Sequence, residues 1–130
     1  MILVDTSAWV EYLRATRSRV DRRLAQLIAD DASLATTDVV LMEVLAGALD
    51  DRHERRLRAL LSRCQFLATL GPSDYEDAAR LYRLCRHAGS APRKLTDCLI
   101  AIVAMRHGAE LLQRDRDFAL IARHSALDLA

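Results

Sequence analysis

The sequence predicts an α/β fold in which a parallel sheet is covered by helices on both faces. Short runs rich in β-branched and aliphatic residues alternate with longer stretches of helical periodicity, an order that builds parallel sheets. The chain has 130 residues, of which 52% are apolar, and this is enough for one sizeable core. Because no linker, repeat or low-complexity segment interrupts it, we expect a single domain over residues 1–130.

The first half of the chain is expected to contain two strands and four helices. The apolar runs Ile2–Val4 and Leu34–Thr37 have the length and residue types of buried strands. Asp5 and Asp38, which follow these runs, are typical of helix starts. The expected helices cover about residues 7–14, 18–29, 39–46 and 51–63. Each strand is thus followed by two helices before the next strand begins.

The second half is expected to add two strands and three helices. Strands are predicted at residues 65–69 and 110–113, and helices at about residues 73–87, 95–107 and 118–124. Ser73 and Glu76 have the spacing of a capping box at the start of the first of these helices. Asp115 and Asp117 are both candidates for the cap of the last helix, and Asp117 is favoured because the helical run follows it directly.

Composition and charge argue against several classes of protein. The net charge of +1 leaves no polybasic tail, and an aromatic content of 5% provides little surface on which single-stranded bases could stack. The three cysteines form no CxxC pair and the four histidines are scattered, so we expect neither a disulfide framework nor a zinc site. No signal peptide is recognisable, and the longest apolar run, residues 98–105, is too short to span a membrane. These features predict a cytoplasmic protein.

Four carboxylates occupy positions that folding alone does not explain. Asp5 and Asp115 each follow a predicted strand, at the edge where open parallel sheets bind ligands. Glu43 and Asp97 are the only charges within two strongly apolar helical stretches. Because those helices look apolar nearly all round, we expect both side chains to be buried, and buried carboxylates are normally paired or bound to metal.

Each of these acids also has a simpler interpretation. Asp5 and Asp115 could cap helices. Glu43 could lie on a solvated stripe, and Asp97 could be a first-turn acid favoured by the helix dipole. Taken together, however, oxygen ligands without histidine or cysteine select Mg²⁺ or Mn²⁺. One or two such ions could hold a phosphodiester and activate the water that attacks it.

Four short segments carry a resemblance to a known family. They are Ile2-Leu3-Val4-Asp5-Thr6-Ser7, Glu43 after an apolar run, Thr96-Asp97 before an apolar helix, and Leu111-Leu112-Gln113-Arg114-Asp115-Arg116-Asp117-Phe118. In order and spacing they resemble the four motifs of PIN domains, and most closely those of the VapC toxins of bacterial toxin–antitoxin pairs. The resemblance extends over essentially the whole chain.

The resemblance implies a three-layer α/β/α fold around a central parallel sheet of four to five strands. It implies an endoribonuclease that depends on one or two Mg²⁺ or Mn²⁺ ions and cuts structured RNA, such as tRNA or rRNA, with a metal-activated water. It also implies a homodimeric toxin whose VapB-like antitoxin covers the active-site groove. Trp9 and Tyr12 would contact the antitoxin, with ordinary core packing as the alternative.

The resemblance also assigns roles to individual residues. The catalytic and metal-binding quartet would be Asp5, Glu43, Asp97 and Asp115, with Asp117 assisting a second ion. Ser7, with Thr6 beside it, would support this site. The expected contacts to RNA phosphates are Arg93, Lys94, Arg114 and Arg116. The fourth motif usually carries Thr or Ser where this chain has Gln113, so a hydroxyl beside the ligands is replaced by a longer amide.

Two other functions are compatible with parts of the pattern. A catalytically silent module that captures RNA or a partner helix would have the same fold, but it leaves the isolated acids unexplained. A phosphohydrolase of the haloacid dehalogenase type is suggested by a strand that ends in Asp5. That class expects a second aspartate at the position of Ser7 and a longer chain.

Overall fold

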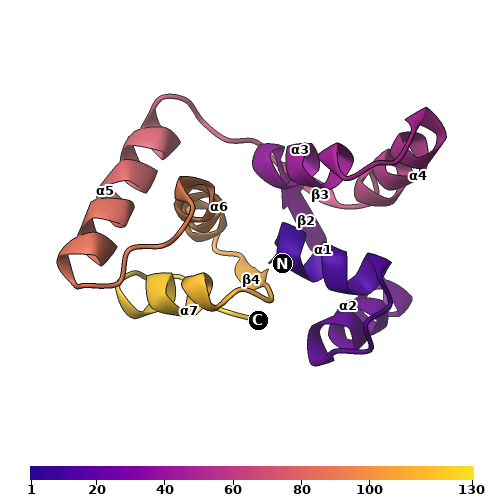
Figure 1. The fold of residues 1–130 in the computed structure, drawn as a ribbon, viewed down its shortest axis with the longest axis horizontal. Helices are drawn as coiled ribbons and strands as arrows, with labels where there is room; N and C mark the ends of the chain where they lie inside the picture. The colour runs from indigo at the N-terminus through magenta and orange to yellow at the C-terminus, as the bar shows by residue number, and fades with distance from the viewer.

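The computed structural model describes residues 1–130 as four strands and seven helices. The strands are β1 (Ile2–Val4), β2 (Leu34–Thr37), β3 (Gln65–Leu67) and β4 (Glu110–Leu112). The helices are α1 (Thr6–Leu13), α2 (Arg19–Ala29), α3 (Asp38–Ala46), α4 (Asp51–Leu61), α5 (Ser73–His87), α6 (Leu95–Arg106) and α7 (Arg116–Arg123). Figure 1 shows α1 to α4 grouped on one side of the molecule and α5 to α7 on the other. Every expected element is present, with small differences at the ends.

The four strands form one parallel sheet in the order β3-β2-β1-β4. The carboxyl ends of β1 and β4 lie in register, with Val4 opposite Leu112. The backbone N–H of Asp5 donates to the carbonyl of Leu112 over 2.9 Å. Residues that follow these two strands therefore emerge side by side at one edge of the sheet, as the sequence predicted.

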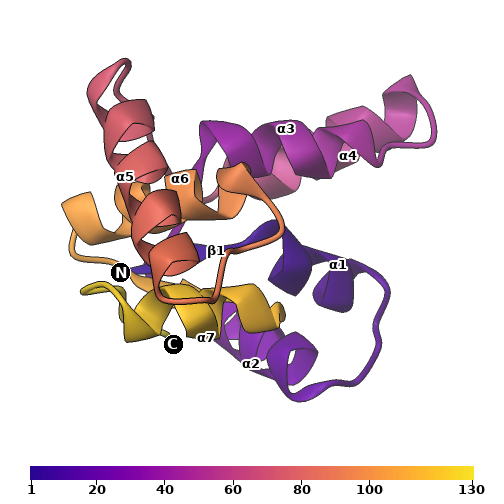
Figure 2. The ribbon, with the colours of Figure 1, turned by 60° about the vertical axis from the view of Figure 1, so that its left-hand side comes forward.

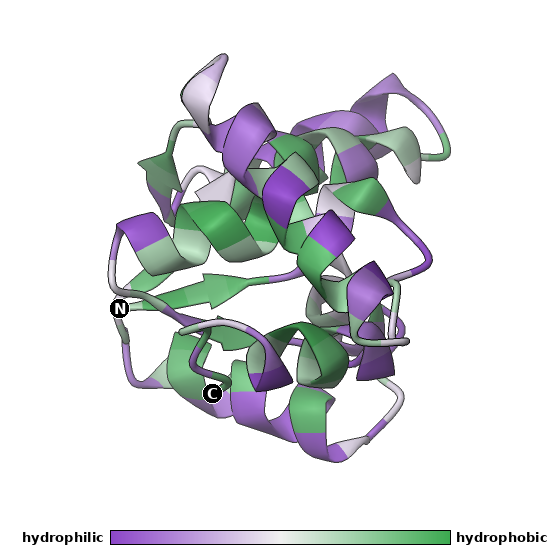
Figure 3. Cartoon of the chain, turned by 90° about the vertical axis from the view of Figure 1, so that its left-hand side faces the viewer, coloured by the Kyte–Doolittle hydropathy of each residue, from purple (hydrophilic) through white to green (hydrophobic).

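Helices cover both faces of this sheet. Figure 2 shows α3 and α6 on one side of β1 and α2 and α7 on the other, and Figure 3 shows apolar strands enclosed between these helical layers. The buried core contains 28 apolar residues, among which Trp9 and Phe118 are the largest fully buried side chains. Helix α6 contributes six of these core residues, which explains its almost uniformly apolar sequence. The predicted three-layer arrangement is confirmed.

The start of α5 differs from the predicted capping box. Pro72 occupies the cap position and Ser73 is already helical, without a side-chain capping bond. The carboxylate of Asp74 instead turns inward, where it accepts the N–H of Leu70 over 2.9 Å and pairs with Arg106. A tertiary ion pair therefore replaces the local capping interaction.

The start of α7 also differs from the prediction. Asp115, rather than Asp117, caps this helix, because its carboxylate accepts the N–H of Asp117 over 3.0 Å. The side chain of Asp117 is 4% exposed and bonds to Arg93 instead.

Candidate metal centre

A polar cleft of about 320 Å³ opens at the carboxyl edge of the sheet, beyond β1 and β4. Asp5, Glu43 and Asp115 line it together with Lys94 and Arg114. The acids come from the turn after β1, from the middle of α3 and from the turn after β4. The predicted convergence of three distant acids on one edge is therefore present in the structure.

Asp97, Asp115 and Asp117 form the tightest group of acids in the molecule. Each offers one carboxylate oxygen, and these three oxygens lie within 4.8 Å of one another. Asp97 stands in the first turn of α6, Asp115 caps α7, and Asp117 stands in the first turn of α7. Of these three acids, Asp115 also lines the cleft, where it meets Asp5 and Glu43, which do not belong to the group.

Asp97 is the least satisfied polar residue of the site. Its side chain is buried, and Oδ2 has no hydrogen-bond partner. Burial raises the pKa of Asp97 to about 7; Lys94 opposes this shift, and the nearby carboxylates, first that of Asp5, add to it. A buried carboxylate oxygen without a donor is costly, and a cation is the group that would compensate it.

Asp5 combines two of the roles that the sequence left open. Its carboxylate caps α1, where Oδ2 accepts the N–H of Ser7 over 2.9 Å and also the Ser7 hydroxyl. It is also 4% exposed and lines the cleft. Burial raises the pKa of Asp5, the bonds from Ser7 lower it, and the Glu43 carboxylate raises it further, with a net increase.

Ser7 links the turns after β1 and β4. Its Oγ donates to Asp5 and accepts the backbone N–H of Arg114 over 2.9 Å. In the second turn, the amide oxygen of Gln113 accepts the N–H of Asp115 over 2.6 Å. Gln113 thus provides an acceptor inside the turn that carries Asp115, in place of the hydroxyl that the family pattern expects.

Glu43 is half-buried, so the expectation that its side chain is buried was wrong. Helix α3 is not covered all round, because Met42 beside Glu43 is 61% exposed. Glu43 points into the cleft rather than to bulk solvent, and its Oε1 accepts the hydroxyl of Thr6 over 2.8 Å. Thr6 is thereby a partner of Glu43.

The four basic residues that flank the acids have different surroundings. Lys94 lines the cleft, and Arg116 is exposed without an ion pair. Arg114 pairs with Glu11, which also lines the cleft and was not identified from the sequence. The sequence gives little indication that Glu11 lines the cleft, because it is an ordinary charged residue on an amphipathic helix.

Arg93 is held by two acids of the group. Its Nη2 donates to Asp115 and its Nε to Asp117, each over 2.9 Å. Burial would raise the pKa of Asp117, but the backbone and side-chain hydrogen bonds from Arg93 outweigh it and leave the pKa lowered. Sequence spacing did not indicate these contacts, because Arg93 and Asp117 are 24 residues apart.

The parallel sheet and the acids at its carboxyl edge define a PIN domain, and the sequence model of that family matches residues 2–124. Ribonuclease VapC11 of Mycobacterium tuberculosis is 44% identical over 131 residues, covering 100% of this chain and 98% of the relative. Ribonuclease VapC32 of the same organism is 32% identical, with coverages of 100% and 97%. The chain therefore belongs to the VapC ribonucleases of the PIN-domain family, and the haloacid dehalogenase alternative is wrong.

Solved structures agree on the fold. VapBC2 from Rickettsia felis, crystallised with a DNA fragment from its promoter, superposes with a TM-score of 0.77 at 21% identity, covering 100% of this chain and 98% of that chain. VapC20 from Mycobacterium tuberculosis, described as a toxin that cleaves the sarcin–ricin loop, gives a TM-score of 0.67 at 17% identity, with coverages of 98% and 99%. None of the helices in the present structure is both long enough and apolar enough to cross a membrane.

Proposed function

We propose that this chain is the toxin of a toxin–antitoxin pair and a metal-dependent endoribonuclease that hydrolyses phosphodiester bonds in structured RNA. Membership of the VapC ribonucleases supports the reaction class. One structural observation carries the proposed site: the buried Asp97, whose Oδ2 has no hydrogen bond, lies within reach of the same ion as Asp115 and Asp117. A purely structural cluster of acids would instead be saturated with donors.

The donor set fits Mg²⁺ or Mn²⁺. Asp97, Asp115 and Asp117 offer oxygen ligands only, and no histidine or cysteine lines the cleft. Asp5 and Glu43 line the cleft beside Asp115 and would complete the surroundings of one ion or two. Such an ion would supply Lewis-acid polarisation of the scissile phosphate and a lowered pKa for the attacking water.

The protein's own side chains position the reacting groups. Ser7 holds one oxygen of Asp5, and the Thr6 hydroxyl holds one oxygen of Glu43, so each carboxylate keeps a fixed orientation. Lys94 and Arg114 at the cleft would bind RNA phosphates, and exposed Arg116 would extend this contact. Phosphate contacts orient the RNA, whereas the acids act on the bond that is cut.

The substrate is proposed to be a folded RNA, such as tRNA or rRNA. The cleft has charged and hydroxyl side chains and only one apolar residue, Val10, so it offers no aromatic platform for unstacked bases. Recognition would therefore depend on the shape and the phosphates of a folded RNA. A protein that cuts such RNA acts where the RNA resides, and we place it in the cytoplasm.

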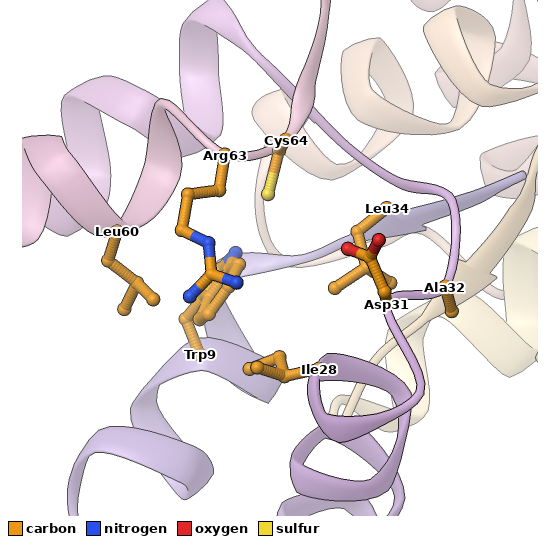
Figure 4. A pocket seen from close by; sticks show the side chains of 8 residues that line it. All are labelled: Trp9, Ile28, Asp31, Ala32, Leu34, Leu60, Arg63 and Cys64. Carbon is orange, nitrogen blue, oxygen red and sulfur yellow. The ribbon is translucent and has the colours of Figure 1, made fainter.

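A VapB-like antitoxin is the proposed partner. An apolar groove of about 400 Å³ runs from Thr6 and Glu43 past Leu13 to Leu49 and Leu57, so an amphipathic segment lying there would reach the acids. Trp9 lines the floor of this groove and also a smaller pocket of about 40 Å³. Figure 4 shows this second pocket, with Arg63 beside Trp9 on one side and Asp31 beside Leu34 on the other.

The aromatic residues of α1 contribute to the core and to this groove. Trp9 is 1% exposed and contacts half-buried Tyr12 edge to face, with ring centroids 6.0 Å apart. Core packing therefore accounts for the surface of Trp9, and half-buried Tyr12 is the aromatic residue of α1 that keeps exposed surface for a partner. For the homodimer, the apolar pocket between α5 and α6, with exposed Tyr75 and Leu95, is the proposed contact surface.

The test is RNA cleavage by the purified chain, freed of antitoxin, on total tRNA and rRNA with Mn²⁺. Cleavage should require the metal, stop with EDTA, and fall at least about 100-fold in Asp5→Asn, because a cleft carboxylate is lost. Asp77→Asn, an exposed change on α5, is the matched control. Cleavage that survives both EDTA and Asp5→Asn would refute the proposal, whereas tight RNA binding without cleavage would favour the silent module.

A further inference from the structure

Arg93 is bound to the acidic group by three hydrogen bonds. Its guanidinium donates from Nη2 to Asp115 Oδ1 and from Nε to Asp117 Oδ2, and its backbone N–H donates to the same Asp117 oxygen over 3.0 Å. Asp115 and Asp117 are also the two residues whose carboxylates lie within 4.8 Å of Asp97. One guanidinium therefore neutralises two of the three carboxylates that are proposed to hold a divalent ion.

The two oxygens that Arg93 contacts each accept two hydrogen bonds. Asp115 Oδ1 accepts Arg93 Nη2 and the N–H of Asp117, and Asp117 Oδ2 accepts both nitrogens of Arg93. A divalent ion that binds to this group would place its two positive charges close to the positive charge of the Arg93 guanidinium. The guanidinium and the ion therefore compete for the same negative charge.

We propose that Arg93 is an internal counter-ion that a divalent cation displaces from Asp115 and Asp117, so that Arg93 limits the metal affinity of the site and becomes free for an RNA phosphate when the ion binds. This inference rests on the proposed metal-dependent function. It reconciles the predicted phosphate contact of Arg93 with its observed ion pairs, because the same side chain serves both in turn.

Exposure makes the displacement reversible. The side chain of Arg93 is 62% exposed, so water replaces its hydrogen bonds at little cost when it leaves the acids. The backbone bond to Asp117 does not involve the guanidinium and keeps the loop before α6 in place. Only the side chain of Arg93 has to move. Lys94, the next residue in the sequence, already lines the cleft where a phosphate would lie.

The first test is the affinity for Mn²⁺ of EDTA-stripped, dialysed protein, measured by isothermal titration calorimetry. Arg93→Gln should bind Mn²⁺ about threefold to tenfold more tightly than the wild type, because one competing charge is removed at an exposed position. Arg93→Lys should lie between them, since it keeps the charge without the two-oxygen fork. Arg80→Gln is the matched control, because Arg80 also bridges two acids, Glu76 and Asp77, and is 59% exposed.

The second test follows the guanidinium directly. In a ¹H–¹⁵N spectrum, the Nε–H signal of Arg93, assigned by its loss in Arg93→Gln, should move toward the position of free arginine as diamagnetic Mg²⁺ is added. Circular dichroism melts establish that each variant is folded. The retained backbone bond to Asp117 favours folding in both Arg93 variants.

The outcomes separate the inference from the proposed function. Equal or weaker Mn²⁺ binding in Arg93→Gln than in Arg80→Gln, or an Nε–H signal that stays in place while Mg²⁺ binds, would overturn the counter-ion role and leave the metal site intact. Mn²⁺ binding by neither the wild type nor Arg93→Gln would overturn both. Binding detected only in Arg93→Gln would be the strongest support for the inference.

Discussion

Asp74 and Asp97 are both buried aspartates in the first turn of a helix, but their surroundings are opposite. Asp74, at the start of α5, accepts hydrogen bonds from Arg106 on both oxygens and from the N–H of Leu70. Asp97, at the start of α6, has a buried oxygen with no donor at all. The first carboxylate is saturated by the fold, and the second is left open for a ligand. The difference separates an acid that stabilises structure from one that is available for chemistry.

The pKa values follow the same division. Burial opposes the ionisation of Asp74, but the hydrogen bonds from Arg106 and Leu70 outweigh it and hold the pKa of Asp74 below its usual value. Burial raises the pKa of Asp97 to about 7, and the Lys94 charge does not compensate it. Both side chains are almost inaccessible to solvent, yet their pKa values shift in opposite directions, because Asp74 receives several donors whereas Asp97 lies deeper in the protein and has an oxygen without a donor.

Asp97→Asn should have the largest effect on activity and little effect on stability. The substitution removes a ligand and a buried charge without a partner, so we expect RNA cleavage to fall at least about 100-fold while the free energy of unfolding stays equal or rises. Cleavage assays with Mn²⁺ and urea denaturation of the chelator-treated protein measure the two effects. A marked loss of stability in Asp97→Asn would show that this carboxylate serves the fold and would remove the contrast with Asp74.

Asp74→Asn should have the opposite effect. It leaves Arg106 partly buried without its anion, and breaking such a pair costs about 3–5 kcal/mol. We therefore expect a clear drop in the urea midpoint and, per folded molecule, unchanged cleavage and unchanged Mn²⁺ affinity. The double variant Asp74→Asn with Arg106→Met should lose less stability than the sum of the single changes. Additive losses would mean that the ion pair contributes little.

The two acids should also give opposite dependences on pH. With its folded pKa raised, Asp97 contributes stability that is fully present below its ordinary value of 3.8 and is lost as the pH rises through about 7. With its pKa lowered, Asp74 contributes stability that is present above 3.8 and is lost as the pH falls through its folded pKa. Thermal melts of Asp97→Asn and Asp74→Asn, compared with the wild type from pH 3 to 8, separate the two contributions.

The same reasoning predicts how metal binding depends on pH. A divalent ion must displace the proton of Asp97, so the affinity for Mn²⁺ should rise by up to about tenfold per pH unit below pH 7 and level off above it. Calorimetric titrations between pH 5.5 and 8 measure this slope. A flat profile over that interval would indicate that Asp97 is ionised throughout and does not control binding.

The sequence predicted Asp97 more accurately than Asp74, and the reason is the range of the interactions. The isolation of Asp97 in an apolar helix is a local pattern, and it correctly predicted burial; the role of Asp97 as a metal ligand stays a prediction. The partner of Asp74 is 32 residues away, so the local pattern Ser73 to Glu76 suggested a capping box that does not form. The fold could be predicted for the same reason, because the periodicities that distinguish strands from helices are local.

The contacts of Glu43 and Arg93 could not be predicted from the sequence in the same way. The half-exposure of Glu43 depends on how much of α3 the neighbouring helices cover, and exposed Met42 shows that this cover is incomplete. The pairing of Arg93 with Asp117 depends on where the loop before α6 lies relative to α7. Both depend on how helices and loops pack against one another, so neither can be read from the spacing of residues along the chain.

The smallest expected effect belongs to Gln113, which supports an acid without being one. Its amide oxygen accepts the N–H of Asp115, so Gln113→Leu should loosen the turn and weaken Mn²⁺ binding by about tenfold, the lower end of what outer partners of metal ligands contribute. Gln113→Glu keeps an acceptor and should retain the hydrogen bond, whereas Gln113→Leu should speed the hydrogen exchange of the Asp115 amide.

If exchange accelerates in Gln113→Leu but Mn²⁺ affinity does not change, Gln113 orders the turn without orienting Asp115. Asp115 would then owe its orientation to Arg93 and to the cap of α7, and substitution of Arg93 in the Gln113→Leu background should change metal affinity as much as it does in the wild type.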